Sequence, residues 1–340
     1  MRTIDWVDGA VEIIDQTALP ATERWLRLST VDQLVDAVVR LAVRGAPALG
    51  VAGALGVALA ARSHADDPLA LADAIRRVET ARPTAVNLSH GVRLAAAALA
   101  EGFDAVLAAA LALRDAEIAA TAAMARRGAD LVGDRCPGQV RLLTHCNTGG
   151  LATVTGGTAL SVVAELHRRG RVAGMIVSET RPLMQGARLT TWELGRLGIP
   201  YRVAVDGAGP FLMARGEVDA VILGADRICA NGDVVNKVGT YAHALGARAA
   251  GLPFFVVAPE STVDDSTATG ADVEIEDRDA AEVLGFREVR VAPDGAAAIN
   301  PAFDVTPHHL ITAIITNART IRPAHPPADH PVDLGVNRVS

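Results

Sequence analysis

The residues best suited to chemistry lie where short apolar segments of the sequence end. Residues 142–157, LLTHCNTGGLATVTGG, lead from an apolar segment through Cys146 into a glycine-rich loop and a predicted helix. Such a loop presents backbone N–H groups to an anion, and a helix N-terminus favours the thiolate form of a nearby cysteine. The loop is neither a Walker A loop nor a G-x-G-x-x-G dinucleotide motif. Cys146 is therefore either a reactive thiol beside an anion or a small residue buried in a tight turn.

A carboxylate and a lysine form a second candidate group. Asp226 directly follows the apolar segment 220–224, and Asn236 and Lys237 come after a short turn. A carboxylate at the end of a strand and close to a lysine is suited to acid or base chemistry, because its ionisation depends on that setting. The structural alternative is that Asp226 only caps the next turn.

Three further segments carry side chains suited to binding phosphate oxygens. Arg44 lies between two apolar helical segments, where an unpaired guanidinium would be costly, so it needs an acidic partner or a ligand phosphate. Arg82 lies in a turn marked by a proline, and Gln185 and Arg188 lie near a helix start. Each of these residues also fits an ordinary surface turn or a solvated helix face.

The spacing of apolar residues predicts how these side chains are positioned. Residues 3–29 predict short strands, and helical periodicity follows at 31–43, 47–61, 67–80, 87–101 and 104–132. Thr30 and Gln33 have the spacing of a capping box at the first helix. After Gly138, buried parallel strands are expected at 140–145, 174–178, 201–205, 220–224 and 254–258, with helices between them.

This alternation predicts an α/β fold with a Rossmann-like, doubly wound parallel sheet, whose ligands bind beyond the carboxyl ends of the strands. We expect a mostly helical N-terminal domain with short β-strands at 1–132 and a linker at 133–138. A Rossmann-like α/β catalytic domain follows at 139–320, and the Pro-rich end, 321–340, is expected to be a disordered tail.

Composition narrows the class of partner. The net charge of the 340-residue chain is −7 and aromatic residues make up 3% of it, which argues against nucleic acid as a partner but not against a small phosphorylated ligand. The uncharged stretch 45–61 is rich in Gly and Ala and is expected to be a buried helix, so no membrane partner is predicted.

The cysteines indicate the cellular compartment, and the histidines bear on whether a metal site is expected. The three cysteines, Cys136, Cys146 and Cys229, form no C-x-x-C motif, and with no secretory signal visible they indicate a reducing, cytoplasmic setting. The nine histidines show no metal-type spacing, so no metal site is expected.

Four blocks of the sequence resemble those of the methylthioribose-1-phosphate isomerase family. That family is similar in turn to the α, β and δ regulatory subunits of the eukaryotic translation-initiation nucleotide exchange factor. The blocks are RGAPALG (44–50), THCNTGGLAT (144–153), ETRPLMQGARLT (179–190) and GADRICANGDVVNKVGTY (224–241). With weaker similarity elsewhere, including PFFVVAPESTVD and NPAFDVTP, the resemblance covers about residues 4–316.

The resemblance implies an activity and a set of site residues. It implies conversion of 5-methylthioribose 1-phosphate to 5-methylthioribulose 1-phosphate in methionine salvage, without a cofactor, by a homodimer with a helical and a Rossmann-like domain. It places the catalytic cysteine and aspartate on Cys146 and Asp226. It places the substrate-binding positions on Arg44, Gly45, Ala46, Arg82, Gln185, Asn236 and Lys237.

Departures from the family pattern leave alternatives open. DGAGPFLM (206–213) stands where the family more often has an Asp-Asn/Ser-Met-Ala run, and Asn-Ala-Arg (317–319) stands where it has Glu-Arg-Gly. The first departure bears on the group recognised at C5 of the sugar. One alternative is therefore an isomerase of 5-deoxyribose 1-phosphate or ribose 1,5-bisphosphate. The other is a non-catalytic protein like the regulatory subunits, against which the presence of both Cys146 and Asp226 counts.

Overall fold

The computed structural model describes residues 1–83, 85–286 and 289–323 and divides into two compact units. Unit 1 holds Met1–Ala122 and Thr148–Gly157, and unit 2 holds Ala123–Asn147 and the chain from Thr158 onward. This division differs from the predicted linker at 133–138, because a single helix, α5 (Phe103–Arg135), continues into it. Of the predicted tail at 321–340, the first residue belongs to strand β16, and residues 324–340 lie outside the described residues.

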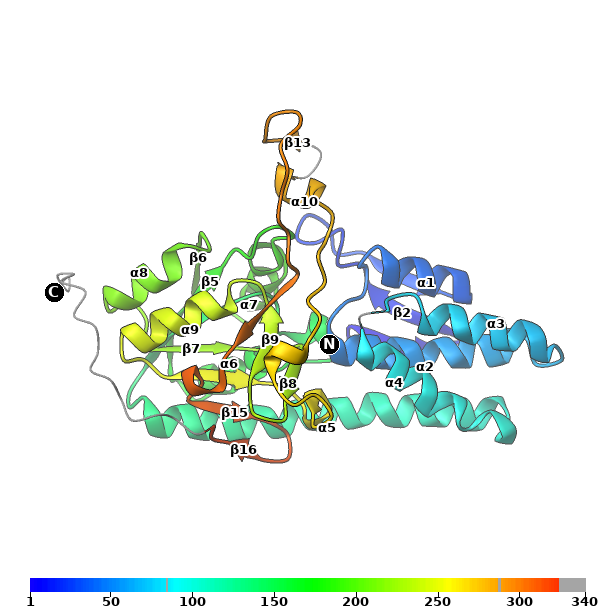
Figure 1. Ribbon diagram of the computed structural model, residues 1–340. Coiled ribbons are helices and arrows are strands. Elements are labelled where there is room, and N and C mark those ends of the chain that lie inside the picture. Colours follow the sequence, from blue (N-terminus) through cyan, green and yellow to red (C-terminus); the bar gives the residue numbers. More distant parts are fainter. Residues whose placement is uncertain (84, 287–288, 324–340) are drawn as a thin grey trace. The chain divides into compact units, whose positions relative to one another are not determined.

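Unit 1 combines a small antiparallel sheet with helices (Figure 1). The strands pair in chain order and are β1 (Ile4–Val7), β2 (Ala10–Ile14) and β3 (Trp25–Leu28). The helical elements are α1 (Val31–Val39), α2 (Ala46–Ser63), α3 (Pro68–Glu79), α4 (Val86–Ala96), η1 (Leu99–Glu101), the first part of α5, and η2 (Gly150–Ala152). The helical N-terminal region expected from the sequence is therefore present.

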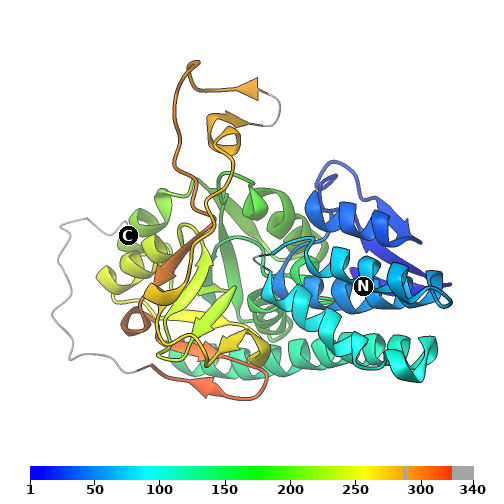
Figure 2. The ribbon, with the colours of Figure 1, turned by 45° about the vertical axis from the view of Figure 1, so that its right-hand side comes forward.

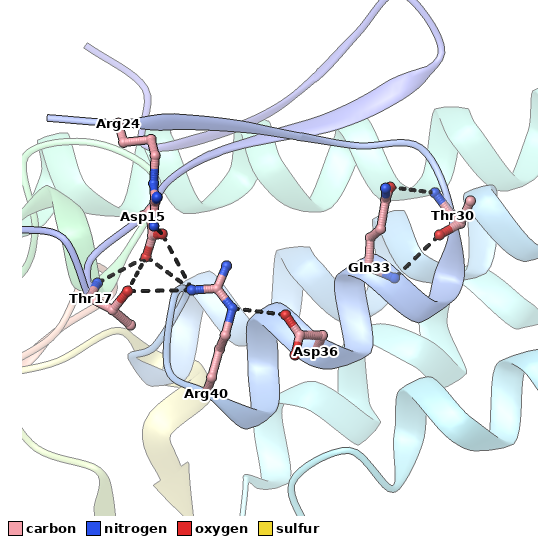
Figure 3. A network of polar contacts seen from close by, with 7 residues as sticks. All are labelled: Asp15, Thr17, Arg24, Thr30, Gln33, Asp36 and Arg40. Atoms are coloured by element: carbon pink, nitrogen blue, oxygen red, sulfur yellow. Dashed lines mark hydrogen bonds and ion pairs between the residues drawn. The ribbon is translucent and has the colours of Figure 1, made fainter.

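Helix α1 has the predicted capping box but is shorter than predicted. The Thr30 hydroxyl accepts the Gln33 backbone N–H, and the Gln33 side-chain oxygen accepts the Thr30 N–H (Figure 3). The helix ends at Val39 rather than at residue 43, because the chain turns at Leu41, whose φ is +65°. The turn that follows carries Arg44 into the start of α2.

Helix α2 is the buried centre of unit 1. An added Cβ on Gly91 of α4 would lie 1.9 Å from the carbonyl oxygen of Gly50, and one on Gly53 would lie 2.5 Å from that of Leu88. Glycine is therefore required where these two helices pack backbone to backbone. Among the described residues, α2 alone has the length and composition of a membrane span, and 83% of that stretch is buried inside the protein.

Unit 2 is built on a seven-stranded sheet with the order β16-β15-β10-β7-β4-β5-β6. All neighbouring strands are parallel except β15 and β16. The strands are β4 (Val140–Thr144), β5 (Val172–Ser178), β6 (Tyr201–Ala204), β7 (Ala220–Leu223), β10 (Phe254–Val257), β15 (Ala313–Ile315) and β16 (Thr320–Ile321). The five strands predicted from the sequence are all present and parallel.

The burial predicted for one of these strands is wrong. Tyr201, Arg202 and Val203 of β6 are exposed, because β6 lies at the edge of the sheet and has a hydrogen-bonded neighbour on one side only. Its apolar sequence resembles that of a buried strand, so periodicity alone did not distinguish the two cases.

Helices cover both faces of this sheet. The helical elements that follow the strands are α6 (Ala159–Arg168), η3 (Gly186–Thr190), α7 (Thr191–Arg196), α8 (Ala208–Ala214) and α9 (Thr240–Ala249). Alternate strand residues such as Leu143 and Val221 pack in one cluster with Met213 of α8 and Ala244 of α9. The intervening residues, such as Ile222, are equally buried, as expected when both faces of a parallel sheet are covered.

Shorter elements complete unit 2. A four-stranded sheet has the order β11-β8-β9-β14, with strands β8 (Arg227–Cys229), β9 (Val234–Lys237), β11 (Val263–Asp264) and β14 (Phe303–Thr306). Single turns are η4 (Glu260–Thr262), η5 (Gly270–Asp272) and η6 (His308–Leu310). An arm carrying α10 (Ala281–Leu284), β12 (Gly285–Phe286) and β13 (Val289–Arg290) extends from the rest of unit 2 (Figure 2).

Candidate active site

Cys146 lies just beyond the carboxyl end of β4, an interior strand of the parallel sheet. Cys146 is 9% exposed, and its φ is +60°, in the left-handed region that residues other than glycine rarely adopt. Its backbone N–H donates to the Thr180 hydroxyl at 2.9 Å, and its carbonyl accepts from the Thr190 hydroxyl at 2.6 Å. The strand end therefore carries a buried thiol, outside any disulfide, on a backbone that is held from two sides.

The segment that follows β5 folds against the same strand end. Asp206, after β6, accepts the Ser178 hydroxyl at 2.5 Å and the N–H groups of Thr180 and Arg181 at 2.7 Å each. An added Cβ on Gly186 would lie 1.8 Å from the Ser178 carbonyl oxygen, so only glycine allows the segment to approach β5 this closely. Asp206 and Gly186 thus fix the loop that supplies Gln185.

Gln185 has the features of a ligand-binding residue. It is 5% exposed, and its side-chain oxygen is buried and accepts no hydrogen bond within the described part of the chain. Buried polar atoms in proteins are nearly always hydrogen-bonded, so such an atom indicates an interaction outside the protein's own groups.

Asp226 reaches the same edge of the sheet as Cys146. It follows β7, which pairs directly with β4 through Leu142↔Ala220 and Leu143↔Val221. Its backbone N–H donates to the Val235 carbonyl at 3.0 Å, which fixes the turn into β8 and β9. Unlike Cys146, Asp226 is exposed. The cysteine and the aspartate therefore follow neighbouring parallel strands, whereas the sequence had predicted only that each follows a strand of one sheet.

Asn236 and Lys237 are buried on β9. The Asn236 amide donates to the Thr240 hydroxyl at 2.9 Å, and the Lys237 ammonium donates to the Ala302 carbonyl at 2.6 Å. The Lys237 nitrogen also lies 4.8 Å from the ring centroid of Phe303. The lysine is thus oriented by the chain itself, with a positive charge kept at low exposure.

Asp304 adds a carboxylate that the sequence did not single out. It pairs with Asn236 across β14 and β9, and one of its oxygens accepts the N–H groups of Gly239 and Tyr241 at 2.7 and 3.1 Å. Burial raises the pKa of Asp304 to about 6, although those N–H groups and the charge of Lys237 act in the opposite direction. Its other oxygen is buried and has no hydrogen-bond partner among the described residues.

Two buried histidines lie behind the strand end. The rings of His145 and His243 are 5.0 Å apart, and the pKa of each is lowered, to about 4 and about 3, chiefly because burial disfavours the charged ring. His145 Nε2 donates to the Val238 carbonyl at 2.8 Å, and His243 Nε2 lies 3.3 Å from the Ser178 hydroxyl. Both rings are therefore neutral near pH 7.

The His243 ring also explains one of the small residues in the 206–213 segment. An added Cβ on Gly209 would lie 2.4 Å from His243 Nδ1. The space beside Gly209 is thus filled by a protein side chain.

The remaining predicted residues belong to unit 1. Arg44, Gly45 and Ala46 form the turn into α2, and an added Cβ on Gly45 would lie 2.3 Å from the Ala152 carbonyl oxygen in the glycine-rich loop. Arg82 lies in the turn before α4, and the N-terminal part of α4 packs on α2, since a Cβ on Gly50 would lie 3.3 Å from the Asn87 carbonyl oxygen. Unit 1 therefore groups both arginine turns and the loop after Cys146.

The predicted site residues thus fall into two sets. Unit 2 brings Cys146, Gln185, Asp226, Asn236 and Lys237 to one end of its sheets, and unit 1 holds the other four. Thr190, His243 and Asp304 were not singled out from the sequence. Thr180 lies two residues after the end of β5, a position that the sequence pattern indicates, whereas Thr190 and His243 lie within helical segments and carried no local signal.

Comparison with known proteins defines the family. Residues 42–323 match the model of the initiation factor 2 subunit family. The chain is 51% identical to a probable bifunctional methylthioribose-1-phosphate isomerase/methylthioribulose-1-phosphate dehydratase of Nocardia farcinica, matching 93% of this chain and only 59% of that protein's length. It is 51% identical to the methylthioribose-1-phosphate isomerase of Anaeromyxobacter sp. strain K, over 93% of this chain and 91% of that one. It is 48% identical to a 5-deoxyribose 1-phosphate isomerase of Moorella thermoacetica, over 95% and 94%.

Solved structures agree with the sequence relatives. The crystal structure of 5-methylthioribose 1-phosphate isomerase from Pyrococcus horikoshii OT3 superposes with a TM-score of 0.88 at 38% identity, covering 95% of this chain and 92% of that one. The structure of translation initiation factor eIF-2B subunit delta from A. fulgidus gives 0.85 at 40% identity, covering 95% and 96%. The chain belongs to the initiation factor 2 subunit family, which the four sequence blocks had indicated.

Proposed function

We propose that this protein is an aldose–ketose isomerase that converts 5-methylthio-α-D-ribose 1-phosphate to 5-methylthio-D-ribulose 1-phosphate in methionine salvage. The observation that carries the proposal is the placement of Cys146 and Asp226 after the neighbouring parallel strands β4 and β7. The names of relatives about half identical over nearly the whole chain support it.

The proposed chemistry starts from a chemical difficulty. The anomeric carbon carries phosphate, so the sugar cannot open to a free aldehyde. Asp226 acts as an acid: the bond between C1 and the ring oxygen breaks, and that oxygen gains the proton. Cys146, as the thiolate, takes a proton from C2 and returns it to C1, while the C2 hydroxyl gives its proton to the Asp226 carboxylate, which restores the acid. C1 then becomes a CH₂ group bearing the phosphate, and C2 becomes a carbonyl.

Direct hydride transfer from C2 to C1 is the competing route, and running the reaction in D₂O separates the two. A proton carried by Cys146 exchanges with solvent in part, so product made in D₂O should contain deuterium at C1 by NMR. Product without deuterium at C1 would contradict the proton shuttle and favour the hydride.

The resemblance to the isomerase family supplies the proposed substrate-binding residues, which are Arg44, Gly45, Ala46, Arg82, Gln185, Asn236 and Lys237. Backbone groups of Gly45 and Ala46 at the start of α2 and the guanidinium groups of Arg44 and Arg82 are suited to the phosphate. Gln185, Asn236 and Lys237 supply amide and ammonium groups to the sugar and its phosphate. The buried oxygen of Gln185, which has no hydrogen-bond partner in the part of the chain that the structure describes, is the feature that most favours a ligand there.

We infer a Rossmann-like catalytic domain, a homodimer and a cytoplasmic location, with no cofactor and no metal. Read along the sheet, β6-β5-β4-β7-β10-β15 has the 3-2-1-4-5-6 strand order of the Rossmann fold. Exposed apolar side chains gather on the edge strand β6, the residues after it, and the adjacent helices α8 and α9, which favours burial against a second copy. They are Tyr201, Val203, Val205, Phe211, Tyr241 and Leu245.

A relative that is 48% identical is named 5-deoxyribose 1-phosphate isomerase, so 5-deoxyribose 1-phosphate is a second candidate substrate. The methylthio and the plain 5-deoxy sugars differ by one apolar group, so discrimination between them should be modest, about 10–200-fold in kcat/KM. Ribose 1,5-bisphosphate should be turned over little, because a second buried phosphate needs further cations.

Measured kcat/KM values for the three sugar phosphates test the proposal. We expect activity on methylthioribose 1-phosphate, weaker activity on 5-deoxyribose 1-phosphate and little on the bisphosphate. A preference for the bisphosphate would contradict the assigned substrate. Inactivity on all three would favour a non-catalytic role like that of the regulatory subunits.

A further inference from the structure

Cys146 holds a backbone conformation that needs support from its surroundings. A φ of +60° is unfavourable for any side chain with a Cβ, and such conformations persist only where neighbouring contacts hold them. They concentrate at functional sites, where they fix the direction of a side chain. The groups that hold this residue are therefore part of how the thiol is placed.

Two threonine hydroxyls hold the two polar groups of this residue's backbone. The Thr180 hydroxyl accepts the Cys146 N–H at 2.9 Å and lies 3.0 Å from the Ser178 carbonyl, to which it donates its own hydrogen. The Thr190 hydroxyl donates to the Cys146 carbonyl at 2.6 Å. Thr180 and Thr190 are each fully buried, so water does not replace these partners.

Both threonines are themselves fixed by their elements. Thr180 has a φ of +67°, rare for a β-branched residue, and its N–H donates to Asp206. Thr190 is the last residue of η3, and its hydroxyl also accepts a hydrogen bond from the Asn147 side-chain amide at 3.3 Å. The same amide donates to the Glu193 carboxylate at 2.8 Å. Each hydroxyl donates one hydrogen bond and accepts another, so neither rotates freely.

We infer that Thr180 and Thr190 are positioning residues for Cys146: their hydroxyls hold its N–H and C=O and so set the place of the thiol in the reaction. This inference rests on the proposed function. Neither residue is assigned a contact with the substrate. Their loss should therefore lower kcat while leaving substrate binding nearly unchanged.

The test uses Thr180→Val and Thr190→Val, which remove the hydroxyl and keep the shape. We expect kcat to fall about 10- to 100-fold and KM to change less than about threefold. Thr180→Ser and Thr190→Ser keep the hydroxyl and should retain kcat within about threefold. Thr191→Val is the matched control, because the Thr191 hydroxyl donates only to the Ala187 carbonyl of its own helical segment, at 2.6 Å, and it should behave like the wild type.

A second readout does not depend on turnover. The rate at which iodoacetamide alkylates Cys146, followed by peptide mass spectrometry across a pH series, reports the setting of the thiol directly. The valine variants should change this rate at least about threefold, with the rates at Cys136 and Cys229 unchanged as internal standards. This separates the two claims, since a wild-type protein inactive on sugar phosphates would refute the proposed function while the alkylation rates still decide the positioning role.

Several results would overturn the inference. Folded valine variants that keep both kcat and the Cys146 alkylation rate would show that the hydroxyls do not matter. Serine variants that lose as much kcat as the valine variants would contradict the role of the hydroxyls, because serine keeps the hydroxyl. If Thr180→Val does not fold, Thr190→Val alone carries the test, because it acts on the other end of the same residue.

Discussion

Two polar clusters, one in each unit and each containing buried polar groups, differ in how completely those groups are hydrogen-bonded. The Asp15 cluster of unit 1 consists of Asp15, Thr17, Arg24 and Arg40 (Figure 3). Asp15 is fully buried, and Thr17 donates to one of its carboxylate oxygens, Arg24 to the other, and Arg40 to both. Although burial raises the pKa of Asp15, these hydrogen bonds and the charge of Arg40 outweigh it and lower the pKa to about 2.

The strand-end cluster of unit 2 consists of His145, Cys146, Gln185 and His243. Here buried polar atoms remain without a hydrogen-bond partner among the described residues, namely Nδ1 of both histidines and Oε1 of Gln185. A buried charge with a complete set of hydrogen-bond partners stabilises the fold. Buried neutral groups that lack such partners can instead bind a ligand or a proton. The comparison thus separates a structural cluster from a candidate catalytic one.

The largest expected effect is at Asp226, beside the strand-end cluster. Asp226→Asn removes the proposed acid and should lower kcat at least about 100-fold, the lower range for an acid–base group, with the fold intact. Steady-state kinetics and circular dichroism measure both. Asp265→Asn, an exposed aspartate on a loop of unit 2, is the control and should leave kcat unchanged. Near wild-type turnover in Asp226→Asn would remove that residue from the mechanism.

The Asp15 cluster should respond in stability rather than in catalysis. Asp15→Asn should lower the free energy of unfolding by about 2 kcal/mol at pH 7, because the folded-state pKa lies well below the unfolded one. The contribution is present above about pH 4 and is lost as the pH falls toward 2. Urea unfolding at several pH values checks this. The exposed Asp36, which pairs only with Arg40, is the control, and Asp36→Asn should cost less than about 0.5 kcal/mol.

Arg44 tests whether unit 1 also contains a functional residue, because Arg44 is a candidate for binding phosphate. Arg44→Ala should raise KM about tenfold and change kcat less, if its contact with phosphate is equal in the ground and transition states. Arg76→Ala, an exposed arginine of α3, should leave KM unchanged. An unchanged KM in Arg44→Ala would place Arg44 with the structural residues.

The smallest expected effect comes from the buried histidines. Because the pKa of His243 is lowered in the fold, the unfolded chain takes up a proton at higher pH than the folded one. Stability is therefore full above about pH 6.5 and declines below it, by on the order of 1 kcal/mol at pH 5.5. Unfolding midpoints at pH 7.5 and 5.5 should differ less in His243→Asn than in the wild type. An equal pH dependence in both would show that His243 does not titrate on unfolding.

The sequence predicted the strands and their chemistry-bearing ends better than the contacts between them. β4 and β7 are continuous apolar segments, so Cys146 and Asp226 could be placed at strand ends without a structure. β8 and β11 are three and two residues long, too short for any periodicity, so their sheet was missed. The hydrogen bonds from Thr180 and Thr190 to Cys146 could not be predicted from the sequence, since these threonines are 34 and 44 residues away in the chain.

Three buried cysteines outside any disulfide allow the most direct test of the central claim, that Cys146 is catalytic. Cys136, Cys146 and Cys229 are 8, 9 and 2% exposed, so burial does not distinguish them. The measurement is kcat on 5-methylthioribose 1-phosphate for the three cysteine-to-serine variants, each with its unfolding midpoint. We predict that Cys146→Ser loses at least about 100-fold in kcat with an unchanged midpoint, and that Cys136→Ser and Cys229→Ser stay within about threefold. Near wild-type turnover in Cys146→Ser would contradict the account.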